Sequence, residues 1–419
     1  MEKKLEKFDV AVIGGGPAGM MAAGYAAELG AKVVLLEKNA ILGRKLLLTG
    51  HGRCNLTNAE FDDQKFIEKL NNKKSKFLFS SLAAFGPEEV IEFFEFRKLK
   101  TKVEKNNRVF PAGDNSCDVL DILKKYLQDN KVKIIFNAEV QVFEKNGKEI
   151  KSVRLKDREI LADKFILCTG GKAYPSTGSI GDGYRWAKDL GHNIIEPSPA
   201  LVPIKTKEDW VKEVQGLSFD KVGINLLQNN KKQYSYSGEI LFTHFGLSGP
   251  AILNLSKKVG ELAKNGEVII SIDLKPDFNR EQLDEKLKKD FPENSNKNIA
   301  NYLTKILPQK MADTSLKLSG IEMTKKIHAV TKEERKKIVS LIKDLRLTYD
   351  DTTGFNQAML TGGGVDLKEV DSKTMQSKII NNLFFAGEIL DLDGLTGGFN
   401  LQICWSTGHA AGTYKALKK

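Results

Sequence analysis

Three glycines near the start of the chain have the spacing of a phosphate-binding turn. Gly14, Gly16 and Gly19 follow the pattern G-x-G-x-x-G. In that pattern the first glycine permits a tight turn, the second lets a pyrophosphate approach the backbone, and the third lets a helix pack closely on a strand. Glu37 follows about 20 residues later, where an acidic side chain hydrogen-bonds ribose hydroxyls. These residues predict a dinucleotide site.

The elements that must position this turn are a strand, a helix and a second strand. Residues 8–13 are apolar and β-prone, and Pro17 suits the first turn of a helix because its missing N–H needs no partner there. An apolar stripe continues to Gly30, and residues 32–36 read as the second strand. The uncharged run 10–27 superficially resembles a signal peptide or a membrane span, but the glycines and Pro17 interrupt it. We therefore expect buried elements of a soluble protein with no membrane partner.

Composition sets the broad class. A chain of 419 residues with 28% charged residues indicates two or three soluble domains. The net charge is +11, and the stretch from Lys275 to Arg346 holds 17 basic and 11 acidic residues. We interpret that excess as a solvated lysine-rich surface, which makes a nucleic-acid partner unlikely. The four cysteines lack a C-x-x-C pair, so we expect reduced thiols in a cytoplasmic protein and no metal site.

Two further segments indicate that the cofactor is FAD and not NAD. The reason is that the flavin end of FAD must be held by parts of the chain far from the glycine turn. Residues 42–58 form a glycine-rich loop with basic side chains that suit a phosphate and a flavin edge. Residues 383–388 read as a buried strand, and Gly397 and Gly398 precede a helix-like run to Leu417. The N-terminus of that helix would stabilise negative charge near N1 and the C2 carbonyl of reduced flavin. The sequence thus predicts FAD as the cofactor.

Several long blocks give the chain a family resemblance along essentially its whole length. It resembles a bacterial flavoprotein family that includes aminoacetone-oxidase-like enzymes and a bile-acid flavoprotein. His51 departs from the family pattern, which usually has glycine there. The blocks are 49–58, 169–175, 178–183, 242–250, 353–355 and 396–402. The glycine motif and the resemblance together predict these FAD-binding residues: Gly14, Gly16, Pro17, Ala18, Gly19, Glu37, Lys38, Arg44, Lys45, Gly52, Arg53, Cys54, Asn55, Val140, Thr169, Gly170, Gly171, Gly387, Glu388, Gly397, Gly398, Asn400 and Leu401.

The middle of the chain changes period, which predicts an insertion in the FAD domain. Val222, Ile224 and Leu226 alternate as in half-buried strands, whereas the spacing after residue 279 is helical. The glycine cluster 362–364 lacks a following amphipathic helix, which argues against a built-in NAD(P)H domain. We expect an α/β fold with a discontinuous Rossmann-type FAD domain (1–195 and 350–419), an inserted barrel-like β domain (196–275 and 340–350) and a small helical subdomain (276–339).

The chemistry expected is hydride transfer between a small organic substrate and flavin N5. His244 and Tyr174 are the catalytic candidates, as a possible acid/base and a substrate-orienting group. The first hypothesis is an amine, aminoketone or amino-acid oxidase that uses O2. The second is an NAD(P)H-dependent reductase of an activated C=C bond, because residues 169–183 look similar to a stretch of fumarate-reductase-like flavoproteins. An RNA-binding flavoprotein ranks last.

Overall fold

The computed structural model describes residues 6–70 and 73–413, which belong to two units. The first unit comprises Met1–Pro199 and Ala358–Lys419, and the second comprises Ala200–Gln357. The second unit is therefore an insertion in the first, with divisions a few residues away from the predicted ones at 195 and 350. Within the described ranges, no helix combines the length and apolar character needed to cross a membrane.

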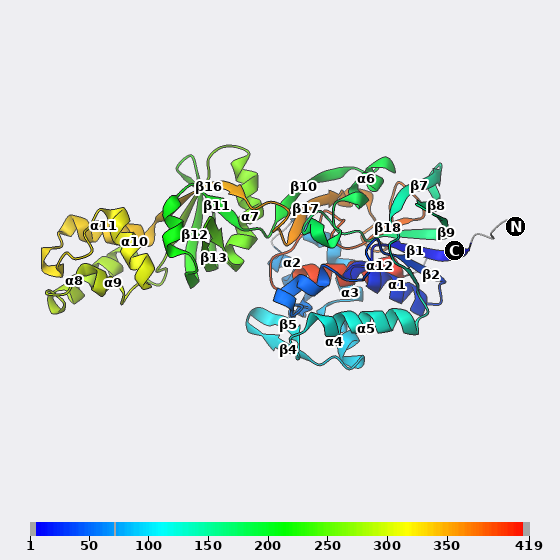
Figure 1. The fold of residues 1–419 in the computed structure, drawn as a ribbon, viewed down its shortest axis with the longest axis horizontal. Helices are drawn as coiled ribbons and strands as arrows, with labels where there is room; N and C mark the ends of the chain where they lie inside the picture. The colour runs from blue at the N-terminus through cyan, green and yellow to red at the C-terminus, as the bar shows by residue number, and fades with distance from the viewer. Residues whose placement is uncertain (1–5, 71–72, 414–419) are drawn as a thin grey trace. The chain divides into compact units, whose positions relative to one another are not determined.

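The largest sheet of the first unit is mainly parallel (Figure 1). Its strands are β1 (Lys7–Ile13), β2 (Val33–Leu36), β6 (Lys133–Ile135), β7 (Val140–Asn146), β8 (Glu149–Leu155), β9 (Glu159–Leu167) and β18 (Leu383–Phe385). The order is β6-β2-β1-β9-β8-β7, and β18 also pairs with β9. Strands β6, β2, β1, β9 and β18 are parallel neighbours, whereas β7, β8 and β9 pair antiparallel. The carboxyl ends of β1, β2, β9 and β18 therefore meet at one edge.

Three helices of this unit pack on one another beside the sheet. They are α1 (Pro17–Glu28), α5 (Ser116–Asp129) and α12 (Phe399–Gly412), and α1 contacts both of the others. Every residue of β2 is buried, as expected for a parallel strand covered on both faces. Gly408 lies so close to α1 that an added Cβ would approach the Ala18 carbonyl oxygen to 2.5 Å. Small residues thus let the first and last helices of the described chain pack closely.

Smaller elements complete the first unit. Between β2 and α5 come α2 (Asp63–Lys69), α3 (Phe79–Ala84), α4 (Pro87–Phe96) and an antiparallel sheet of β3 (Thr57–Asn58), β5 (Arg108–Pro111) and β4 (Thr101–Glu104). After β9 come α6 (Asp182–Asp189) and a two-stranded sheet of β10 (Ile194–Ala200) and β17 (Leu360–Val365). The predicted glycine cluster 362–364 lies within β17.

The second unit contains a closed barrel. Its strands are β11 (Ile204–Thr206), β12 (Ser218–Gln228), β13 (Lys231–Thr243), β14 (Gly246–Ser248), β15 (Ile269–Asp273) and β16 (Leu345–Thr352), and α7 (Pro250–Ala263) packs on β13. Ile224 pairs with Ile272 and Leu226 pairs with Ile270, and all four side chains are buried. The alternation in the sequence is therefore the inside-outside period of barrel strands.

Four helices join the barrel strands β15 and β16. They are α8 (Arg280–Glu293), α9 (Ile299–Leu303), α10 (Gln309–Ser319) and α11 (Lys332–Lys343). Thr331 and Glu334 form the predicted capping box at the start of α11. The predicted fold class, a Rossmann-type α/β domain with an inserted barrel and helices, is confirmed. The predicted C-terminal helix ends at Gly412, and the part of it from 414 onward lies outside the described residues.

Candidate dinucleotide-binding site

The turn between β1 and α1 shows why glycine stands at each motif position. Gly14 has a φ of +104°, and a Cβ there would lie 2.5 Å from the Cys168 carbonyl oxygen. A Cβ on Gly19 would lie 1.8 Å from the Gly14 carbonyl oxygen. Around Gly16, by contrast, no described atom other than those of its chain neighbours lies within 4 Å of the Cβ position. Two glycines thus serve close packing, and the third keeps the backbone open toward a cavity.

The helix that follows presents its N-terminus to this cavity. Gly16 is the N-cap of α1 and provides no side-chain hydrogen bond, and Pro17 occupies the first helical position. The first-turn N–H groups of a helix lack partners inside the helix, and the helix dipole places partial positive charge there. Gly16, Pro17 and Ala18 all line the cavity. This turn is therefore suited to an anionic pyrophosphate.

Glu37 lies at the carboxyl end of β2 and is held by three hydrogen bonds. Its Oε2 accepts from the Gly15 backbone N–H at 2.8 Å. Its Oε1 accepts from the backbone N–H and the side-chain Nδ2 of Asn39, at 2.8 and 2.7 Å. The side chain is 7% exposed and lines the cavity. A carboxylate oxygen can accept more than one hydrogen bond, so the fixed Glu37 remains able to accept from ribose hydroxyls.

The opposite part of the cavity contains a fixed ion pair. Lys45 Nζ lies 2.6 Å from Glu388 Oε2, and the two side chains are 20% and 11% exposed. Glu388 Oε1 accepts from the Thr361 backbone N–H at 2.9 Å. Glu388 follows β18 and Glu37 follows β2, with β1 and β9 between these strands. Three strand spacings place the two strand ends about 14 Å apart, which suits an extended ligand lying across the sheet edge.

The N-terminus of α12 also faces the cavity. Asn400 and Leu401 line it, and the N-cap Gly398 has no side chain to cap the helix. Asn400 fixes the preceding loop, because its Oδ1 accepts from the Gly394 N–H at 2.8 Å and its Nδ2 donates to the Leu395 carbonyl at 3.0 Å. Gly398 has a φ of +99° and packs against Thr57. A second helix N-terminus is thus directed at the cavity.

Most of the predicted cofactor residues come together in this one cavity. Those that line it arise from segments as far apart as Gly14 and Leu401, as the predicted discontinuous domain requires. The lining residues that the sequence predicts are Gly14, Gly16, Pro17, Ala18, Glu37, Lys38, Arg44, Lys45, Val140, Thr169, Gly170, Gly387, Glu388, Asn400 and Leu401. Open backbone at Gly16, two helix N-termini and a fixed carboxylate at the strand edge are features that FAD requires, so these residues fit it.

The remaining predicted residues do not line the cavity. Gly19 and Gly171 are packed under other backbone or side-chain atoms, and a Cβ on Gly171 would lie 2.3 Å from Thr361 Oγ1. Cys54 is buried, and burial raises the pKa of its thiol to about 12. Its thiol therefore remains protonated near neutral pH. The predicted residues absent from the lining are Gly19, Gly52, Arg53, Cys54, Asn55, Gly171, Gly397 and Gly398.

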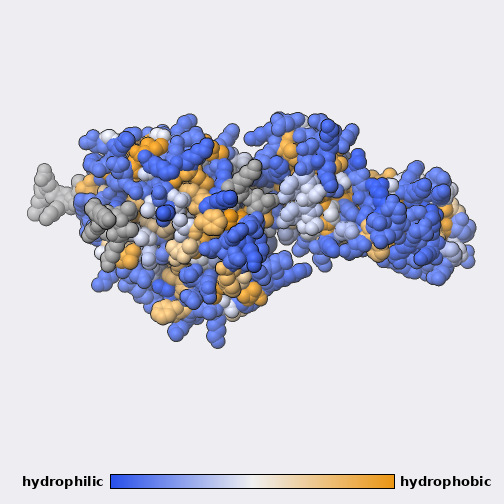
Figure 2. Space-filling view, turned by 180° about the vertical axis from the view of Figure 1, so that it is seen from behind, coloured by the Kyte–Doolittle hydropathy of each residue, from blue (hydrophilic) through white to orange (hydrophobic). Residues whose placement is uncertain are grey.

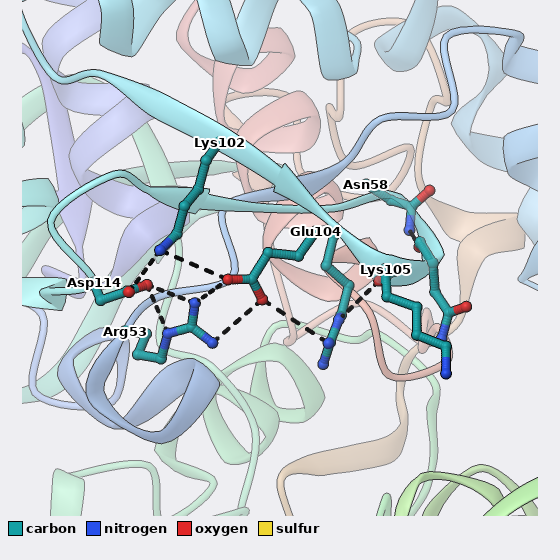
Figure 3. A network of polar contacts seen from close by, with 8 residues as sticks. Arg53, Asn58, Lys102, Glu104, Lys105 and Asp114 are labelled. Carbon is teal, nitrogen blue, oxygen red and sulfur yellow. Dashed lines mark hydrogen bonds and ion pairs between the residues drawn. The ribbon is translucent and has the colours of Figure 1, made fainter. Parts of the chain in front are cut away.

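Arg53 is engaged elsewhere, in the polar network of Figure 3. Its Nε donates to Asp114 Oδ1 at 2.7 Å, and its guanidinium also pairs with Glu104. The guanidinium carbon lies 4.1 Å from the centre of the Phe110 ring. The Glu104 carboxylate, and then Asp114, raise the pKa of Arg53. The charge of Arg53 is thus balanced beside the small sheet and does not reach the cavity lining.

The sequence missed several residues that complete the lining. Asn39 is the most informative, because it links Glu37 to Arg44, whose Nη1 donates to Asn39 Oδ1 at 3.0 Å. Asp182 pairs with Lys38 at 2.7 Å. Only the glycine-rich block 178–183 gave a signal for this region. Other lining residues that the sequence did not single out are Thr49, Ala138, Glu139, Thr177, Met359, Leu360 and Cys404.

The two predicted catalytic residues belong to different units, Tyr174 to the first and His244 to the second. Tyr174 has a φ of +52°, is half-buried and is not among the lining residues. His244 is exposed in the second unit, with its ring centre 4.9 Å from that of Phe245. Both roles remain predictions. Cys404 does line the cavity, but burial, and to a lesser degree Glu388, raise the pKa of its thiol to about 12.

The chain matches the family model described as the HI0933-like protein Rossmann domain over residues 8–414. It is 32% identical to a 3-dehydro-bile acid delta(4,6)-reductase of Clostridium scindens, covering 96% of this chain and 98% of that protein. It is 30% identical to a ribosomal RNA dihydrouridine synthase of Haemophilus influenzae, covering 95% and 96%. A 3-ketosteroid delta1-dehydrogenase of Sterolibacterium denitrificans shares the fold, with a TM-score of 0.53, 12% identity and coverage of 99% and 100%.

Proposed function

The chain belongs to the HI0933-like Rossmann family, whose members are FAD-dependent oxidoreductases, and from this membership we propose that it reduces a C=C bond conjugated to a carbonyl group. One observation carries the proposal. Two of the relatives that match almost the whole chain act, by their names, on delta(4,6) bonds of a 3-dehydro-bile acid and on uridine, whose C5=C6 bond becomes saturated in dihydrouridine. The substrates differ in size, but each bond lies next to a carbonyl group that can take up negative charge.

The cavity provides what such a reduction needs from the protein. Bound FAD, once reduced, supplies a hydride. The first turns of α1 and α12 stabilise negative charge on the bound cofactor through free N–H groups and helix dipoles. Reduction of a C=C bond also consumes one proton, and Lys45 holds protons at Nζ within the cavity wall. Its partner Glu388 keeps that ammonium group in place.

We place a small enone or dienone first among substrates. The C. scindens relative is 32% identical over 406 residues. The apolar residues Met359, Leu360 and Leu401 line the cavity and suit a hydrocarbon body. Such a substrate agrees with the predicted small-molecule partner and with the predicted reductase alternative.

Uridine in ribosomal RNA is the second candidate, favoured by the H. influenzae relative and by charge. The chain carries +11 overall, and a positive protein surface attracts a polyanion. RNA binding is the lowest-ranked hypothesis from the sequence, because acidic residues are interspersed among the basic ones between Lys275 and Arg346. The predicted amine oxidase with O2 as acceptor remains a further alternative, for which neither of these two relatives adds support.

The test uses the purified FAD-loaded protein without oxygen. We expect NADH or NADPH to bleach the flavin, and a conjugated enone to restore the yellow colour in a stoichiometric amount. An unconjugated alkene of the same skeleton is the control and should leave the flavin reduced. Rapid reoxidation by air with peroxide release, and none by any enone, would instead favour the oxidase.

The RNA candidate needs its own measurement. Ribosomal RNA from cells that lack the protein is incubated with the reduced enzyme and digested to nucleosides. Mass spectrometry should then detect a uridine heavier by two hydrogens at a defined site. An enone that reoxidises the flavin while the RNA stays unchanged would assign the small-molecule substrate.

A further inference from the structure

A second cavity of the first unit shares no lining residue with the dinucleotide site. It is a depression open to solvent, with a volume of about 650 Å³, and residues of α1, α4, α5 and α12 line it. Aromatic rings form much of its wall, and they belong to Tyr25, Phe85, Phe93, Tyr126 and His409. We refer to this cavity as the aromatic groove. The proposed reductase chemistry does not use it.

The rings of the groove support one another. His409 is stacked between two of them, with ring centres 3.8 Å from Tyr25 and 4.6 Å from Phe85. Phe93 meets Tyr126 edge-on with ring centres 5.0 Å apart. Burial lowers the pKa of His409 to about 4, so its ring is neutral at physiological pH. The wall is thus a rigid set of π-faces without positive charge from the histidine.

The rim of the groove is acidic in a chain that is basic overall. Four carboxylates line it, those of Glu28, Glu89, Glu92 and Glu95, while the whole chain carries +11. Among residues 6–70 and 73–413, none of these four forms an ion pair, although Glu28 accepts a hydrogen bond from the Tyr126 hydroxyl, Glu89 from the Gly86 backbone N–H, and Glu95 from Thr101. Phe96, which also lines the groove, is 81% exposed. Figure 2 shows hydrophobic patches on the hydrophilic surface of the first unit. The rim therefore favours a cation and repels an anion.

The side chain of Arg97 already forms cation–π contacts with rings of the groove. The guanidinium carbon of Arg97 lies 3.8 Å from the ring centre of Phe93 and 4.5 Å from that of Tyr126. These are cation–π distances. The guanidinium is partly buried there, and this burial lowers the pKa of Arg97. One cation leaves most of the rim charge unbalanced, so the groove has capacity for a second.

The ends of two helices add to this preference. Tyr25 and Glu28 lie in the last turn of α1, and His409 lies in the last turn of α12. The C-terminal end of a helix carries partial negative charge and favours cations. Carboxylates, π-faces and helix ends therefore act in the same direction.

We propose that the aromatic groove is a binding site for a small organic ammonium ion, with its alkyl groups against the rings and its charge beside Glu92 and Glu95. The argument does not depend on the proposed reductase activity. RNA phosphates, pyridine nucleotides and a bile-acid carboxylate are all anions, which this rim repels. The occupant is therefore a different molecule from the bile-acid-type and RNA substrates and from the hydride donor.

The test titrates the FAD-loaded protein with choline and with 3,3-dimethylbutan-1-ol, which has the same shape without the charge. Calorimetry should show choline binding at least tenfold more tightly than the neutral alcohol. The Glu92→Gln/Glu95→Gln double variant should weaken choline binding at least fivefold. Glu88→Gln is the matched control, because Glu88 is exposed on the same helix but does not line the groove. It should leave the affinity unchanged.

A third variant tests whether Arg97 itself occupies the cation position over the Phe93 and Tyr126 rings. Arg97→Ala removes the internal cation and should strengthen choline binding. If only this variant bound choline, Arg97 would be the permanent occupant and the proposal would be wrong. Equal binding of choline and the alcohol, or equal weakening by Glu88→Gln, would also overturn it. The flavin absorbance of each variant reports that the dinucleotide site is intact, so a failure here is distinct from a failure of the reductase proposal.

Discussion

The dinucleotide cavity and the aromatic groove are lined by opposite ends of the same two helices. At their N-termini, α1 and α12 present free N–H groups, and the cavity there suits a pyrophosphate and a flavin. At their C-terminal ends, the same helices border rings and carboxylates that suit a cation. The direction of a helix thus sets the sign of charge that each end accepts, and at the C-terminal ends the carboxylates of the groove add to that preference.

The two regions also differ in how the backbone contributes. The cavity depends on glycines whose missing side chains let the backbone come close, whereas the groove depends on large side chains. Substitutions that add or remove a few atoms should therefore act on the cavity mainly through geometry and on the groove mainly through charge. Substitutions in both regions can test that difference, and their expected effects run from the loss of FAD binding and stability down to a change seen only in acid.

Gly19→Ala should have the largest effect. The new Cβ would lie 1.8 Å from the Gly14 carbonyl oxygen, so the helix must move off the strand. We expect a loss of about 3 kcal/mol in the free energy of unfolding and a colourless protein. Urea unfolding and flavin absorbance measure the two effects. Gly16→Ala is the control, because its Cβ meets no described atom. It should retain the stability of the FAD-free protein and lose FAD affinity at least tenfold.

Glu388→Gln should come next, because it leaves the half-buried Lys45 ammonium without its carboxylate. We expect a loss of about 2 kcal/mol in the free energy of unfolding. The comparison is Asp182→Asn, which breaks the more exposed pair with Lys38. That change should cost less than about 1 kcal/mol. Equal losses for the two variants would show that burial does not govern these pairs.

Glu37→Gln should weaken FAD binding about tenfold, which corresponds to about 1.4 kcal/mol. The amide retains one acceptor oxygen for Gly15 or Asn39 but loses the charge and the second acceptor. Equilibrium titration of the FAD-free protein measures the change. An unchanged affinity would mean that Glu37 serves only to hold the turn and Asn39.

Near neutral pH His409→Phe should have the smallest effect, because the ring is uncharged there and the difference develops only in acid. The pKa of His409 is about 4 in the folded chain and near 6.5 in the unfolded chain. The unfolded state therefore binds more protons as the pH falls, and this residue lowers stability progressively from pH 6.5 to pH 4. The phenyl ring keeps the stack and cannot titrate. Thermal unfolding of the variant should fall less steeply across that window, and parallel curves would contradict the assignment.

Much of the fold could be predicted because its signals are local. Gly14, Gly16, Gly19 and Glu37 lie within one strand-helix-strand unit, and their spacing alone indicates a dinucleotide turn. The alternation around Ile224 predicted barrel strands, and Thr331 marked a helix start. In each case the chain neighbours within a few residues carry the information, because turns, caps and strand periods are set by local backbone geometry.

The sequence by itself thus determined the elements, the glycine turn and the need for two distant segments around one cofactor. Only the tertiary structure decided that Lys45 pairs with Glu388, that Arg53 turns away to Glu104, and that Tyr25, Phe85 and His409 stack into a groove. The physical reason is that such contacts join residues tens to hundreds of positions apart. They depend on which faces of the packed helices and strands meet, and no spacing along the chain encodes that choice.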